Sequence, residues 1–115
     1  HGYSLCIVNT GGNHADLNED YASVPAEMKA VAAVLGVPVL RKTDEEALLA
    51  NIAKVREACG DRALMRAMHF FDDNARVVEQ AAAIRAGDID TFFAAVTASG
   101  DSSWKLLQNL IRLLP

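Results

Sequence analysis

A long apolar stripe between residues 62 and 86 constrains the fold of this chain more than any other feature. Apolar side chains recur there at spacings of four and three residues: Leu64, Met68, Phe71, Ala75, Val78 and Ala82. A stripe with this period lies on one face of an α-helix and is buried against neighbouring elements. Gly87 is a typical helix stop, and Asp88 is the expected N-cap of a following helix that buries Ile89 and Phe92. The pattern predicts a long helix followed directly by a second one.

Two further helices are predicted before this stripe. The first runs from about Asp20 to Gly36, with Pro25 in its first turn. The second opens at a capping box, with Thr43 as the N-cap and Glu46 three residues on, and it ends at Gly60. Its expected buried line is Leu48, Ile52, Val55 and Cys59.

The C-terminal part of the chain predicts a turn and one more helix. Residues 99–101, Ser-Gly-Asp, have the composition of a turn. A last helix is expected from about Ser102, and its apolar positions are Trp104, Leu107, Ile111 and Leu114.

The N-terminal part predicts a strand. Residues 4–10 form an apolar run with β-branched members, and Gly11 and Gly12 close it. No later segment offers an obvious partner, so its sheet is expected outside this chain. The fold class is therefore mostly α with one N-terminal β-strand: a single partial domain over residues 1–115, with a strand at about 4–10 and then five helices. The start without Met and the apolar end indicate a fragment of a longer chain.

Composition argues against several classes of protein. Eleven Lys and Arg against 15 Asp and Glu lack the basic excess that binding to nucleic acid needs. No apolar run approaches the roughly 18 residues of a membrane span. Cys6 and Cys59 lie in apolar surroundings without metal-ligand spacing, so both are expected to be buried thiols in a reducing cytoplasm. We expect neither a nucleic-acid nor a membrane partner, and no metal site.

A polar row shares one face of the long predicted helix: Arg62, Arg66, His69, Asp73 and Arg76. Two interpretations remain open. The row could handle anions or protons, with Asp73 orienting His69, or it could be a salt-bridge ladder that is solvated or lies at an interface.

Three other features are weaker. The stretch from Gly11 to His14 resembles a phosphate-binding loop, but neither full nucleotide motif occurs, and a turn leaving the strand is the simpler interpretation. Tyr21, beside Glu19 and Asp20, could hydrogen-bond a polyol or could simply flank a helix with its ring. Trp104 fits a core or interface position, and no nucleophile elbow is present.

A longer string of residues resembles the galactokinase branch of the GHMP small-molecule kinases over about residues 4–103. The N-terminal matches are Ile7-Val8-Asn9-Thr10, His14, Asp20-Tyr21, Leu35-Gly36, Leu40-Arg41 and Glu45-Glu46. The later matches are Arg66-Ala67-Met68-His69, Asp73-Asn74-Ala75-Arg76, Gly87-Asp88, Ser99 and Ser102. The spacing from the Asn to the Tyr is that of the family.

The resemblance implies that the parent chain is an ATP- and Mg²⁺-dependent kinase that phosphorylates the anomeric hydroxyl of galactose or a related sugar in the cytoplasm. It also implies that this chain is a helical fragment of an α+β GHMP kinase-type fold. The family's phosphate loop, catalytic Asp and later Gly-rich segment have no match here. The fragment is therefore expected to hold no catalytic residue and no bound cofactor. Of the family's substrate contacts, only the sugar-binding Tyr carries over, as Tyr21.

Two departures from the family pattern leave an alternative open. Val24 and Pro25 stand where the family has Arg, and Ser99-Gly100 replaces a Ser-His step. The alternative is a non-catalytic sugar sensor, or a helical protein-interaction module, descended from the kinase. Because a strand edge and an apolar C-terminal helix would be exposed, self-association through both is also expected.

Overall fold

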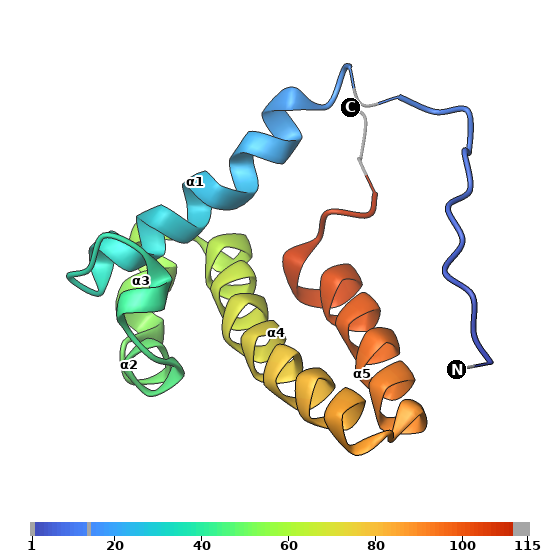
Figure 1. The fold of residues 1–115 in the computed structure, drawn as a ribbon. Coiled ribbons are helices and arrows are strands. Elements are labelled where there is room, and N and C mark those ends of the chain that lie inside the picture. The colour runs from blue at the N-terminus through green and yellow to red at the C-terminus, as the bar shows by residue number, and fades with distance from the viewer. Residues whose placement is uncertain (1, 14, 112–115) are drawn as a thin grey trace.

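A computed structural model describes residues 2–13 and 15–111 (Figure 1). Its elements are α1 (Asn18–Val34), η1 (Leu40–Lys42), α2 (Glu45–Ala50), α3 (Ile52–Cys59), α4 (Asp61–Ala86), α5 (Ile89–Ser102) and the π-helical turn η2 (Ser103–Leu107). The predicted helical character of the chain is confirmed.

Helix α4 is the central element of the fold. Its first half packs against α1, α2 and α3. From about His69 onward it pairs with α5, which returns beside it after the turn at Gly87 (Figure 1). The main core forms where α1, η1, α2 and α3 meet the start of α4. Its fully or almost fully buried side chains are Val31, Ala32, Leu40, Leu48, Val55, Ala63, Leu64 and Ala67.

The predicted apolar stripe of α4 is buried only in its first half. Leu64 is buried, and Met68 and Phe71 are half-buried against the core. Ala75, Val78 and Ala82 are exposed. The polar row of α4 takes their place against α5, so sequence periodicity alone assigned the wrong face to the second half of this helix.

Local capping explains several boundaries. Gly87 ends α4 with φ +72°, a left-handed conformation that glycine adopts without a Cβ clash. Asp88 caps α5 as predicted, since its carboxylate accepts the N–H of Thr91 at 3.1 Å. The predicted Thr43 cap is wrong: Asp44 is the N-cap, and its Oδ1 accepts the N–H of Ala47 at 2.8 Å.

Other predicted boundaries also move. The helix predicted from Thr43 to Gly60 is divided at Asn51, whose side chain donates to the Ala47 carbonyl at 2.8 Å. Because α1 begins at Asn18, Tyr21 lies inside the helix and Pro25 lies beyond its first turn.

The predicted strand is absent from the described part of the chain. Residues 4–10 are extended but take part in no sheet, and Leu5 and Ile7 are 98% and 96% exposed. A strand needs a hydrogen-bonded neighbour, and none of the described segments provides one. The segment contacts the helices through Tyr3, whose ring meets that of Phe93 on α5 edge to face, with centroids 5.3 Å apart.

The predicted C-terminal turn and helix are also corrected. Ser99, Gly100 and Asp101 lie within α5, and the chain then widens into the π-helical turn η2 instead of starting a new helix. After Leu107, the described residues 108–111 are not helical, and the predicted position Leu114 falls outside the described residues. Trp104 is 54% exposed, so it is not a core residue within the described chain.

Candidate functional site

Tyr21 lies on a groove between the start of α1 and residues 108–111. The groove has a volume of about 660 Å³, and its polar lining includes Asp20, Tyr21, Ser23, Arg62, Gln108 and Asn109. Apolar side chains from Val24, Pro25 and Leu110 complete the walls. Tyr21 is 53% exposed, so its ring is accessible from solvent. A phenol beside amide, hydroxyl and guanidinium groups suits a ligand with several hydroxyls.

Arg66 joins the two walls of this groove. Its side chain is almost completely buried, although it lies only one turn after the exposed Arg62 on α4. On the α1 side it donates to Ser23 Oγ at 3.0 Å and to Glu27 Oε2 at 2.8 Å. On the C-terminal side it donates to the carbonyl of Leu107 at 2.8 Å and to that of Gln108 at 3.4 Å.

Glu27 forms ion pairs with two arginines at the base of the groove. It pairs with Arg66, and the Nε of Arg62 donates to Glu27 Oε1 at 3.0 Å. Partial burial opposes ionisation of Glu27. The hydrogen bonds and positive charges of Arg62 and Arg66 outweigh that effect and hold the pKa of this carboxyl below its usual value. The cluster is therefore charged and paired at neutral pH.

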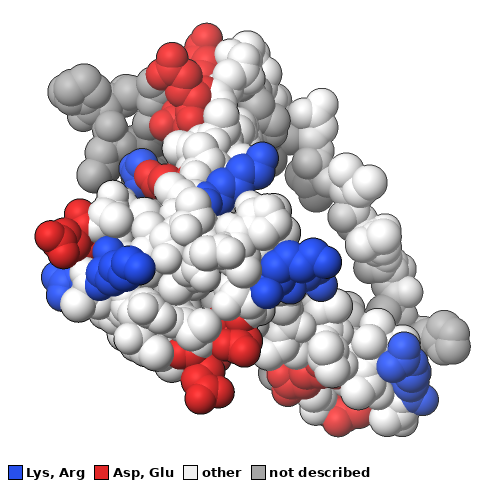
Figure 2. All heavy atoms as spheres, turned by 90° about the vertical axis from the view of Figure 1, so that its left-hand side faces the viewer, with Lys and Arg blue, Asp and Glu red and all other residues white. Residues whose placement is uncertain are grey.

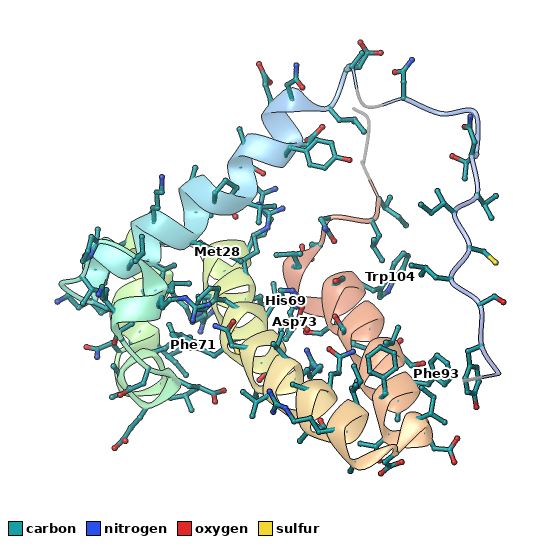
Figure 3. All side chains as sticks on the ribbon, in the orientation of Figure 1. Met28, His69, Phe71, Asp73, Phe93 and Trp104 are labelled. Carbon is teal, nitrogen blue, oxygen red and sulfur yellow. The ribbon has the colours of Figure 1, made fainter. Side chains whose placement is uncertain are left out.

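The rest of the polar row forms a network between α4 and α5. His69 Nδ1 lies 2.8 Å from Ser102 Oγ, and its Nε2 lies 3.3 Å from Asp73 Oδ2. Asp73 also accepts from Arg76 at 2.7 Å and from Ser99 at 3.2 Å. His69 and Asp73 are labelled in Figure 3, on the side of α4 that faces α5.

The contacts of this network link Ser102, His69 and Asp73 in the order of a catalytic triad, but the serine hydroxyl is not accessible to a substrate. Ser102 is 5% exposed, and the carboxylate of Asp73 is shared with Arg76 and Ser99. Burial lowers the pKa of His69, which favours the neutral ring. A neutral ring protonated on Nε2 donates to Asp73 and accepts the Ser102 hydroxyl at Nδ1. Of the two interpretations, the contacts support the interface ladder.

A smaller hollow of about 290 Å³ lies next to this network. His69, Asp73 and Asn74 supply its polar lining, and Met28 and Phe70 are among its apolar side chains. Met28, His69 and Asp73 surround it from α1 and α4 (Figure 3).

The remaining candidate features do not gather into a site. Gly11 and Gly12 lie in an exposed segment, where the N–H of Gly11 donates to Asn9 Oδ1 at 2.8 Å, and His14 lies outside the described residues. Cys6 is exposed, against the prediction of a buried thiol, because the segment that carries it joins no sheet within the described residues. Cys59 is half-buried against the core.

The described chain has neither a cluster of metal ligands nor a membrane-spanning helix. Within residues 2–13 and 15–111, no three His, Cys, Asp or Glu side chains are grouped to hold a metal ion. No helix of these same ranges has the length and apolarity to cross a bilayer. Basic and acidic side chains are interspersed over the face seen in Figure 2.

Sequence reasoning found Tyr21 and the arginines but not their arrangement. Spacing on one helix placed Arg62 and Arg66 together. It carried no signal for Glu27, which lies 39 residues before Arg66, or for the carbonyls of Leu107 and Gln108. Those contacts depend on tertiary packing.

Comparison with curated proteins finds galactokinases. The chain is 31% identical over 102 residues to a galactokinase of Actinobacillus pleuropneumoniae, and 29% identical over 101 residues to one of Glaesserella parasuis serovar 5. These matches cover 89% and 88% of this chain but 26% of each relative, so the chain spans about a quarter of their length. No family model and no solved structure matches the chain. The chain is thus related to one part of galactokinases.

Proposed function

We propose that this chain is part of a galactokinase-like sugar kinase of the GHMP family and forms one wall of its sugar site. The complete protein would transfer the γ-phosphoryl group of ATP to the anomeric hydroxyl of galactose or a related sugar, in the cytoplasm. The observation that carries the proposal is the placement of Tyr21. The residue matching the family's sugar-binding Tyr lines a polar, accessible groove, in a chain similar to galactokinases over 89% of its length.

The groove supplies only the positioning part of such a reaction. Phosphoryl transfer depends on a cradle for the phosphates, on Mg²⁺ to neutralise developing charge and on a group that orients the attacking hydroxyl. Tyr21 and its polar neighbours can orient a sugar through its hydroxyls. ATP and Mg²⁺ would be held by segments of the parent enzyme outside this chain, which therefore carries no catalytic residue.

Activity of the complete protein tests the proposal. The complete reading frame containing this segment should phosphorylate galactose with ATP and Mg²⁺, and the 115-residue chain alone should not. The readout is ADP release, with the sugar omitted as the control. Turnover by the isolated chain would refute the assignment of catalysis to other segments. Absence of binding and phosphorylation of galactose and of related hexoses by the complete protein would refute the kinase itself.

The exposed apolar surface favours a second candidate, a non-catalytic sugar sensor or interaction module descended from the kinase. Leu5, Ile7 and Val8 are largely exposed on the extended N-terminal segment, and Trp104 is half-exposed beyond α5. Apolar surface of this kind favours contact with another protein or with a second copy. Complete protein that binds galactose without turnover would support the sensor. Sedimentation of the 115-residue chain as a monomer at high concentration would refute self-association.

A further inference from the structure

The C-terminal wall of the Tyr21 groove begins at an unusual backbone conformation. Gln108 has φ 56° and ψ 50°. Among the described residues, it is the only one other than glycine that has a positive φ. Such a conformation costs a residue with a side chain about 1 kcal/mol and persists only where the surroundings hold it. It follows a π-helical turn, a form often found at functional sites. The positive φ of Gln108 and the π-helical turn η2 together direct residues 108–111 back toward α1.

Arg66 on α4 holds this turn through two hydrogen bonds, in addition to those that Gln108 itself makes to Ser103, Lys105 and Met65. It binds the carbonyls of Leu107 and Gln108, which flank the strained backbone, and the N–H of Gln108 donates to the Ser103 carbonyl at 2.8 Å. The same guanidinium reaches Ser23 and Glu27 on α1, within two turns of Tyr21. One buried side chain thus fixes the position of each groove wall relative to the other.

We propose that Arg66 is a positioning residue for the sugar site, which sets the width of the Tyr21 groove by tying residues 107 and 108 to α1. This inference rests on the proposed function. Arg66 does not need to touch the sugar. Its role is to hold residues 108 and 109, which line one wall of the groove, in a fixed position relative to Tyr21 on the other wall.

The geometry requires arginine rather than lysine. The planar guanidinium donates in different directions at once, here to two carbonyls, a hydroxyl and a carboxylate. A lysine at this position would keep the positive charge beside Glu27 but could not reach both walls together. Glu27 would remain paired with Arg62 in such a variant. Arg66→Lys therefore weakens the link between the walls while leaving no isolated buried carboxylate.

The test compares Arg66→Lys with Arg56→Lys. Arg56 makes an exposed ion pair with Asp61, away from the groove, so its substitution controls for the loss of a guanidinium. In the complete protein, Arg66→Lys should raise the KM for galactose about tenfold with kcat changed less than about twofold, because charged hydrogen bonds that position the substrate wall are lost. Arg56→Lys should change neither. In the isolated chain, Arg66→Lys should speed amide exchange at residues 103–111 and raise acrylamide quenching of Trp104, the single tryptophan.

The two readouts separate the possible failures. Unchanged KM in Arg66→Lys, or faster exchange spread evenly over α1, α4 and α5, would overturn the positioning role. If Arg66→Lys does not fold, Ser23→Ala removes one contact of Arg66 and should raise KM about threefold with the fold retained. An unchanged KM for galactose in Ser23→Ala would also overturn the positioning role of Arg66. If the wild-type complete protein neither binds nor phosphorylates galactose or a related hexose, the proposed function fails, while exchange at residues 103–111 still decides whether Arg66 holds the wall.

Discussion

At the scale of single residues, buried polar side chains hold this fold together beside a modest apolar core. Arg66 and His69 lie one turn apart on α4 and are buried, yet each meets partners from other elements. Burial of polar groups is tolerated only when their hydrogen bonds are satisfied. The described chain has no buried side-chain nitrogen or oxygen that lacks a partner. The polar row of α4 is therefore an organised interface.

His69 makes the stability of the chain depend on pH. Burial lowers its pKa; Arg76 acts in the same direction, while Asp73 and Asp72 oppose it. Since the folded pKa lies below the unfolded value of about 6.5, unfolding takes up a proton as the pH falls through that range. The stability contributed by neutral His69 is present above about pH 6.5 and is lost on acidification toward the folded pKa.

We therefore expect the free energy of unfolding to decrease between about pH 7.5 and pH 5.5, and to decrease less in His69→Gln, which cannot be protonated. Urea titrations of the wild type and of His69→Gln at the two pH values measure the decrease in the free energy of unfolding of each protein. An equal decrease in wild type and variant would contradict the role of His69.

At the scale of elements, two glycines of similar sequence context have opposite roles. Gly87 ends α4 with φ +72°, whereas Gly100 lies inside α5 with open space where a Cβ would be. Alanine at a left-handed position is strained, but alanine in a helix restricts the unfolded chain and stabilises the fold.

Gly87→Ala should lower the free energy of unfolding by about 1 kcal/mol, and Gly100→Ala should raise it by about 0.5–1 kcal/mol. Denaturation midpoints of the two variants measure the contrast. Destabilisation by Gly100→Ala would instead indicate the turn that the composition of residues 99–101 predicts.

The elements that could be predicted from the sequence are those set by local signals. Gly87 and Asp88 mark a helix end and a cap through backbone geometry that depends on neighbouring residues alone. The break at Asn51 coincides with the hydrogen bond from its side chain to the Ala47 carbonyl, which the apolar period of the segment does not reveal. The continuation of α5 through Gly100 accompanies its packing against α4, which no local pattern encodes. The groove likewise combines a local signal and a tertiary one. Tyr21 could be predicted from its motif, whereas the opposite wall of the groove at residues 108–111 follows from the tertiary contacts of Arg66.

At the scale of the whole molecule, the helices form a scaffold with an apolar segment beside it. Residues 4–8 are extended and almost fully exposed, and their β-branched composition suits a strand within a sheet (Figure 1). Within the described residues the helical part is held together by α4, whereas the extended segment contacts it at Tyr3 and Phe93. A protein more than three times this length, as the galactokinase relatives are, has ample chain to provide such a sheet.

If Tyr21 contacts the sugar, as we propose, the galactose KM of the complete protein should respond to Tyr21→Phe. Loss of the phenol hydroxyl should raise KM about fivefold. Tyr3→Phe is the matched control, since Tyr3 packs on Phe93 outside the groove and should leave KM unchanged. A KM for Tyr21→Phe equal to that of wild type and of Tyr3→Phe would contradict the account.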